Sequence, residues 1–177
     1  MTLTSRLAHL PPGLVALTAT ARGMEGGSMA RAAREAFAEL CGAVGSAGLM
    51  PRVRSCLSLC PDTPRGADDP DCRYVAGFVF GHALAEGQGA PEQPELPLGG
   101  TLAWWPLQPG PCRVFLHRGP YDTLGRTWQA IRREGLPASG ATLRDAPPME
   151  LVLNDPETTA PQDLLTEVWI PVQETPA

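Results

Sequence analysis

Residues 113–124 read RVFLHRGPYDTL, an apolar, strand-like run that leads through Arg118-Gly119 into a helical segment. An earlier part of the chain follows the same plan, because the apolar run 14–20 leads into Arg22-Gly23 and then into another helical segment. The two copies are separated by about 95 residues, a spacing that indicates an internal duplication. The sequence therefore predicts two copies of one supersecondary unit.

Each copy is predicted to contain one helix after its first strand. The first helix should begin with Ser28 as its N-cap and run to about Val44, with a buried stripe at helical spacing formed by Met29, Ala33, Phe37, Leu40 and Val44. The second should begin near Asp122 and end at Gly135, with one apolar face formed by Leu124, Trp128 and Ile131.

Two further strands are expected after each helix. Runs 51–60 and 149–153 each end in a turn rich in Asp and Pro, and the apolar runs 73–80 and 164–172 then close the two copies. Each unit is thus predicted to be β-α-β-β.

The segment between the copies divides into a linker and a hairpin. Residues 86–99 are rich in Gly, Pro and Glu without periodicity and are interpreted as a linker. Strands 102–105 and 113–117 are predicted to pair as a hairpin through the Gln-Pro-Gly turn at 108–110.

The predicted fold is α+β: one eight-stranded, mostly antiparallel sheet with two helices and a central groove. Neither half alone would bury much surface, so a single domain over 1–177 is expected. Its first repeat covers about 12–82 and its second about 100–173.

Composition excludes several functions. The formal net charge is −5, which argues against direct nucleic-acid binding but permits cationic ligands or an acidic surface for a protein partner. No Lys is present, so Schiff-base chemistry is excluded. The beginning of the chain lacks the pattern of a signal peptide and no run is long enough to span a membrane, which predicts a cytoplasmic protein. The five Cys residues are not expected to form a disulfide framework, and no metal site or cofactor is predicted.

Three motifs of the second half occur in a specific order. They are HRGPYDTL at 117–124, PMELVLNDP at 148–156 and TEVWIPV at 166–172. Together they resemble the GyrI-like effector-binding domain, which occurs fused to AraC-type and MerR-type regulators and also as a free-standing protein. The duplication extends the resemblance to nearly the whole chain. Only two clear helices are present and both belong to the repeat, so a free-standing member without a DNA-binding domain is expected.

The resemblance implies a pseudo-two-fold duplication with a groove between the helices. Family members bind hydrophobic, often cationic small molecules there and contact a Glu on the last strand. Some members hydrolyse cyclopropane-bearing genotoxic compounds, and others resemble gyrase inhibitors. The leading hypothesis is small-molecule binding, with a hydrolase as an alternative and inhibition of DNA gyrase, or an interaction with a regulator protein, as a further alternative.

Glu167 is the main candidate residue for this pocket, and in the hydrolase alternative it would also activate water or protonate the leaving group. Side chains alternate along a strand, so Glu167 and Trp169 should share one face while Thr166 and Val168 share the other. A carboxylate beside a Trp is poorly placed for a solvated charge, and burial without a partner would raise its pKa. Solvent exposure of an ordinary surface carboxylate is the alternative.

Aromatic residues are the candidates for gripping a planar or cationic ligand. Trp169 is the first of them; Trp128 could belong either to the pocket or to the core; and one of the adjacent Trp104 and Trp105 should face inward, without the sequence showing which. The remaining candidate ligand-binding residues are Tyr74, Phe78 and Phe37.

Three polar residues complete the predictions. Tyr121, in the turn before the second helix, is a candidate for pocket contact or catalytic support, with a contact beneath the turn as the alternative. Glu150, just before the Asn-Asp-Pro turn, is a second acid candidate. His117 matches the family's turn histidine and is interpreted mainly as structural.

Overall fold

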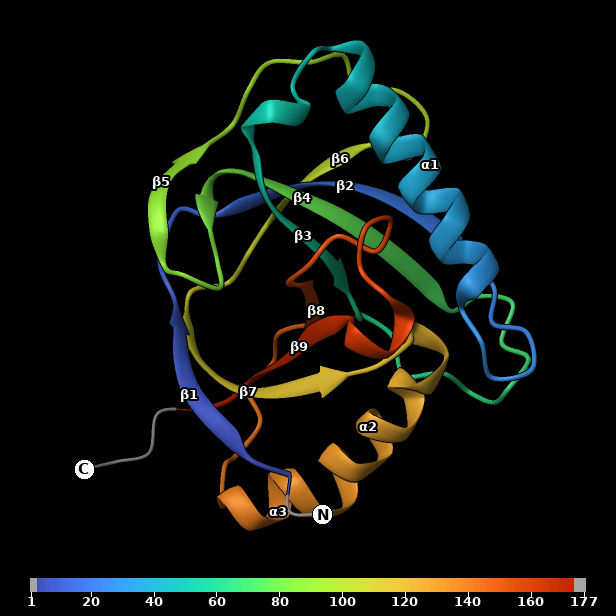
Figure 1. The fold of residues 1–177 in the computed structure, drawn as a ribbon, viewed down its shortest axis with the longest axis vertical. Helices are drawn as coiled ribbons and strands as arrows, with labels where there is room; N and C mark the ends of the chain where they lie inside the picture. Colours follow the sequence, from blue (N-terminus) through green and yellow to red (C-terminus); the bar gives the residue numbers. More distant parts are fainter. Residues whose placement is uncertain (1–2, 174–177) are drawn as a thin grey trace.

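The structure is a computed structural model that describes residues 3–173 (Figure 1). Its strands are β1 (Ser5–Leu10), β2 (Val15–Arg22), β3 (Val53–Leu59), β4 (Arg73–Ala83), β5 (Gln88–Glu92), β6 (Ala103–Pro106), β7 (Gly110–Arg118), β8 (Met149–Val152) and β9 (Leu165–Pro171). Its helices are α1 (Ala30–Ser46), α2 (Leu124–Ala130), a π-helical turn (Ile131–Gly135) and α3 (Leu136–Ser139), and short 3-10 turns cover Met50–Arg52, Tyr121–Thr123 and Pro161–Asp163.

All the strands belong to one sheet, in which every pair of strands is antiparallel. Eight of them follow the order β1-β7-β9-β8-β3-β4-β2-β6, and β5 pairs with β4 beside this path. The repeats are β2-α1-β3-β4 and β7-α2-β8-β9, and they meet where β3 pairs with β8. The predicted α+β fold with a duplicated β-α-β-β unit is confirmed.

Two strands were not predicted, and the predicted hairpin is wrong. β1 lies before the expected first repeat, and β5 lies inside the expected linker 86–99. The strands β6 and β7 follow one another along the chain, but β6 pairs with β2 whereas β7 pairs with β1 and β9. The turn at 108–110 therefore joins two strands that lie in different halves of the sheet.

The connections between strands force the sheet to curl. Residues 11–14 join β1 to β2, and residues 107–109 join β6 to β7, yet each pair of strands is six positions apart in the sheet. Six strand spacings would cover about 29 Å in a flat sheet, whereas a link of four residues reaches at most about 18 Å. The two links meet, because the Leu107 N–H donates to the Leu14 carbonyl over 2.9 Å. The result is a half-barrel.

The concave side of the curl, here called the inner face, is an apolar core. Residues from both ends and from the middle of the sheet pack together there: Leu10, Leu14, Ala16, Leu57, Leu59, Val75, Val79, Leu107, Val114, Met149, Leu151 and Trp169. Gly77 belongs to the same packing, since a Cβ at this position would lie 2.8 Å from Leu57 Cδ1. The inner face is therefore closed by the sheet itself.

The opposite side, here called the helix face, carries the helices in two separate clusters. α1 packs on β2 and β4 through a buried stripe formed by Ala32, Ala36, Leu40 and Val44, with Phe37 half-buried beside it. The predicted stripe was thus displaced at its beginning, because Ser28 and Met29 precede the helix and Ala33 is only half-buried. The second helix packs on β7 and β9 through Leu124 of α2 and Ile131 of the π-helical turn, which pack with Phe115, Val168 and Ile170.

The second helix does not end at Gly135, as predicted, but continues to Ser139. Pro137 cannot donate a backbone hydrogen bond, and the π-helical turn lies just before it. Gly135 remains helical and buried because the helix comes very close to the sheet, where an added Cβ would lie 2.7 Å from Phe115 Cε1. The end of the helix is Gly140, which has the positive φ typical of such a stop.

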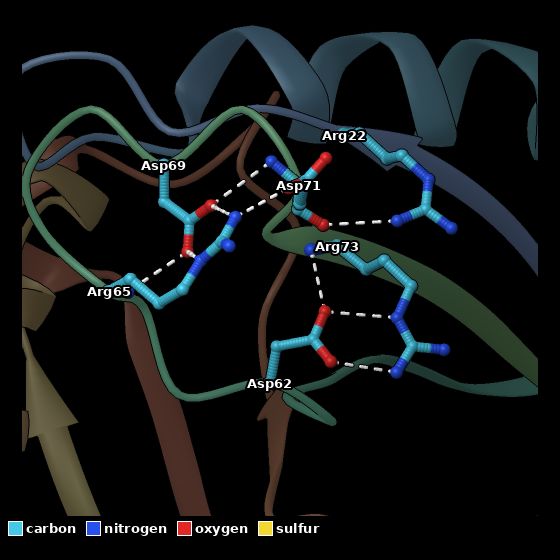
Figure 2. Close-up of polar contacts among 6 residues, drawn as sticks. All are labelled: Arg22, Asp62, Arg65, Asp69, Asp71 and Arg73. Carbon is cyan, nitrogen blue, oxygen red and sulfur yellow. Dashed lines mark hydrogen bonds and ion pairs between the residues drawn. The ribbon is translucent and has the colours of Figure 1, made fainter.

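Ion pairs fasten the loop between β3 and β4 next to the beginning of α1 (Figure 2). The buried Asp69 carboxylate accepts hydrogen bonds from the Arg65 side chain and from the backbone N–H groups of Arg65 and Asp71. Asp62 holds Arg73 in a bidentate pair at 2.7 and 2.9 Å. The backbone of this loop also bonds the segment before α1, for example from the Met24 N–H to the Asp69 carbonyl.

We expect the substitution Asp69→Asn to lower the free energy of unfolding at pH 7. The Arg65 guanidinium holds the pKa of Asp69 well below its usual range, so its contribution is complete above about pH 4 and is lost as the pH falls towards the folded-state pKa. Urea denaturation at pH 7 and pH 3 should show a smaller difference between variant and wild type at the lower pH. The exposed Glu86→Gln serves as control, and an equal difference at both pH values would contradict this account.

Candidate functional site

A polar strip separates the two helix-covered clusters on the helix face. Ser58 of β3 lies directly opposite Glu150 of β8, and Val152 of β8 lies opposite Thr166 of β9. Opposed residues in an antiparallel sheet point to the same side. We call these four residues the central strip. It crosses the line where the two repeats meet.

Glu150 is the only ionisable residue of the central strip. Its Oε2 accepts a hydrogen bond from the Ser58 hydroxyl at 2.9 Å, and its Oε1 accepts one from the Trp128 indole N–H at 2.6 Å. Trp128 therefore reaches from α2 across to β8. The guanidinium of Arg132, one helical turn further on, lies 5.4 Å from the Trp128 ring centre and covers it by a cation–π contact.

Aromatic side chains and thiols surround this carboxylate. Tyr74 of β4 contacts Phe37 of α1 edge-on, with ring centres 6.1 Å apart, on the α1 side of the strip. Tyr121 lies on the α2 side and is 43% exposed. The β8–β9 connection lies between the two helices in Figure 1 and completes the surroundings. Besides burial, the charge of Asp155 in this connection contributes to raising the pKa of Tyr121. The charge of Glu157 contributes in the same way to the raised pKa of Cys41 in α1.

These surroundings change the acidity of several groups. Burial raises the pKa of Glu150, although the hydrogen bonds from Trp128 and Ser58 oppose the change. Burial also raises the pKa of Tyr74, with a smaller contribution from the charge of Glu150. The pKa of the Cys56 thiol is raised to about 12, mainly by burial. A thiol with this pKa is protonated at neutral pH and is a poor nucleophile.

His117 holds the start of the second helix against the sheet. Its Nδ1 is 2.8 Å from the Thr127 hydroxyl, and its Nε2 is 3.4 Å from the Pro120 carbonyl and 3.5 Å from the Thr123 hydroxyl. The residue is 4% exposed. This environment supports the structural interpretation of the histidine.

Glu167 lies on the inner face, away from both helices. It is 8% exposed, and its carboxylate accepts hydrogen bonds from Arg6 at 2.7 Å and from the Trp169 indole at 2.9 Å. Arg6 also covers Trp169, with 5.4 Å between the guanidinium carbon and the ring centre. The sequence correctly placed Glu167 beside Trp169, but the carboxylate is paired and not an isolated buried charge.

The predicted ligand-binding residues are therefore divided between two faces. Glu167, Trp169 and Trp105 belong to the inner face, where both Trp residues line a cavity of about 20 Å³. That volume accommodates little more than a water molecule. The helix face carries the other candidates: Trp128, Tyr121, Tyr74, Phe78, Phe37 and Trp104. Trp104 packs edge-on against Phe80, within the α1 cluster.

The structure gives three further findings for residues 3–173. No helix there is both long enough and apolar enough to cross a membrane, and no group of three or more His, Cys, Asp or Glu side chains is arranged to hold a metal ion. All five cysteines are free.

A family model of the GyrI-like small molecule binding domain matches residues 20–173. The chain belongs to this family. The match begins near the end of β2 and includes the rest of both repeats and the whole central strip, so the resemblance seen in the three sequence motifs is confirmed.

Solved structures with the same fold include the following three. The C-terminal domain of EcmrR is 14% identical with a TM-score of 0.65, and the match covers 99% of this chain and 100% of that one. SAV2435 bound to tetraphenylphosphonium is 17% identical with a TM-score of 0.55, covering 97% and 94%. A hydrolase encoded by lin2189 from Listeria innocua is 12% identical with a TM-score of 0.52, covering 97% and 93%. At these identities the likeness shows the fold of this GyrI-like domain.

Reasoning from the sequence ranked Glu150 below Glu167 and did not single out Ser58 or Thr166 as site residues. Ser58 interrupts the apolar run of β3, and Glu150 interrupts that of β8 on the same face. Two polar residues that face each other across neighbouring strands would indicate a site. The sequence alone does not show that Ser58 and Glu150 face each other, because this requires the register of β3 against β8.

We expect Glu150→Gln to raise the melting temperature at pH 7. Because the folded-state pKa of Glu150 is raised, stability decreases as the pH rises above about 4.3, and the Gln side chain removes this loss. Glu167→Gln, the matched control, should instead lower the free energy of unfolding by about 1 kcal/mol because it weakens the contacts with Arg6 and Trp169. Thermal denaturation at pH 7 and pH 4 measures both effects. A lower melting temperature for Glu150→Gln at pH 7 would contradict the account.

Proposed function

We propose that this GyrI-like domain binds a hydrophobic, cationic aromatic small molecule over the central strip, with Glu150 as its counter-charge. The observation that carries the proposal is that both hydrogen bonds to this carboxylate come from neutral donors. Ser58 and Trp128 donate to it, and within residues 3–173 no Arg or His forms an ion pair with it. A ligand cation would supply the missing charge.

The hydrogen-bonding capacity of Glu150 is not exhausted. A carboxylate accepts about four hydrogen bonds, and side chains of residues 3–173 donate two to Glu150. Trp128 and Tyr74 add aromatic rings, whose faces attract cations and stack on planar groups. The half-buried Trp128 and the exposed Tyr121 lie where a ligand from solvent would first make contact.

The comparisons support this class of function. The family is described as small molecule binding, and SAV2435 was solved with tetraphenylphosphonium, a hydrophobic aromatic cation. Glu167, in contrast, already has Arg6 as a cationic partner. The proposed position of the ligand is therefore the helix face and not the inner face.

The substitution Glu150→Gln should weaken binding of tetraphenylphosphonium by about 10- to 100-fold, the effect of losing an interaction with a charged group of about 1.5–3 kcal/mol. Isothermal titration calorimetry on the purified protein measures it. Glu167→Gln serves as the matched control and should leave the affinity unchanged. The reverse pattern would place the ligand at Glu167, as the strand alternation had suggested.

The affinity for tetraphenylphosphonium should fall as the pH is lowered. The phosphonium carries a fixed charge, and burial raises the pKa of Glu150, so protonation of this residue removes the counter-charge at a higher pH than for an exposed Glu. Titrations between pH 8 and pH 4.5 should show the loss in wild type and a nearly constant, weak affinity in Glu150→Gln. An identical pH dependence in both proteins would rule out Glu150 as the titrating group.

A second candidate function is hydrolysis of an electrophilic small molecule, such as a cyclopropane-bearing compound. A carboxyl group with a raised pKa can protonate a leaving group or activate water, and Tyr121 lies close enough to be affected by its charge. Turnover by the wild type that is lost in a Glu150→Gln variant that still folds would distinguish hydrolysis from binding alone. A gyrase-directed role gains no support from the comparisons.

A further inference from the structure

Thr166 carries a buried hydroxyl group without a hydrogen-bond partner. The residue is 1% exposed, and its Oγ1 finds no donor or acceptor. Among the described residues, other buried side-chain atoms without partners belong to His82, Arg113 and Arg144, and none of these residues is in the central strip. An unpaired buried hydroxyl is unfavourable, and Val would have the same shape without this group.

The neighbours of Thr166 on the helix face explain why the hydroxyl has no partner. His117, directly opposite on β7, uses its ring nitrogens toward Thr127, Thr123 and Pro120. Val152, directly opposite on β8, is apolar, and so is Val168, the next residue on the same face of β9. The chain therefore supplies no group to this hydroxyl from the adjacent strands.

Thr166 lies near Glu150 on the helix face, on the adjacent strand. Glu150 lies opposite Val168, so Thr166 is its diagonal neighbour across the β8–β9 pair. Diagonal neighbours in antiparallel strands are separated by about 7–8 Å. One benzene ring carrying two para substituents spans a distance of this kind.

We propose that Thr166 is a specificity-determining residue, whose hydroxyl donates a hydrogen bond to an acceptor that the ligand carries about one aromatic ring away from its cationic centre. This inference rests on the proposed function, because it takes Glu150 as the position of the cation. It narrows the ligand class to aromatic cations with a carbonyl, ether or similar oxygen. A purely hydrocarbon cation would bind but would leave the hydroxyl unpaired.

Two matched probes test the proposal. (4-Benzoylphenyl)trimethylammonium carries a ketone oxygen one para-substituted ring from the cation, and (4-benzylphenyl)trimethylammonium replaces the ketone with a methylene group. Calorimetric titration should show that wild-type protein binds the ketone about 3- to 10-fold more tightly, the effect of one neutral hydrogen bond. Thr166→Val should bind both probes equally, and Thr166→Ser, which keeps a hydroxyl, should retain the preference.

Thr166→Val should also raise the melting temperature of the free protein, because it removes an unpaired buried hydroxyl. Equal affinity of the two probes for wild type, or a ketone preference that persists in Thr166→Val, would overturn the assignment of Thr166. If Glu150→Gln binds both probes as tightly as wild type, or if neither probe binds the wild type, the proposed function itself is wrong.

Discussion

Two short links, residues 11–14 and 107–109, are the constraint on which the rest of the structure depends. Each joins strands that lie six positions apart, and they touch through the hydrogen bond between Leu107 and Leu14. The sheet must curl to allow this, and its inner face then fills with its own apolar side chains. The two helices pack in separate clusters on the other face and leave the central strip between them.

Glu167 and Glu150 are compensated in different ways. Glu167 lies at the edge of the inner core and is compensated by Arg6, which covers Trp169 as well. Glu150 lies where the repeats meet and accepts hydrogen bonds from the neutral side chains of Ser58 and Trp128, and burial raises its pKa. Of these two acids, only Glu167 forms an ion pair within residues 3–173.

Much of the fold follows from the sequence, because a repeated pattern of strand, helix and two strands specifies its own packing. The alternation along the closing strand also predicted correctly that Glu167 and Trp169 share a face. Alternation cannot tell which face meets the helices, since that depends on the curl of the whole sheet. The predicted hairpin at 108–110 is wrong for a related reason. A turn motif specifies a local reversal, whereas β6 and β7 pair with strands that are distant in the sequence.

The location of the ligand is the central claim, and a crystal structure with tetraphenylarsonium would test it most directly, because arsenic can be located by its anomalous scattering. The account predicts an anomalous peak on the helix face, next to the Glu150 carboxylate and the Trp128 ring. A peak beside Glu167 and Trp169, on the inner face, would contradict it.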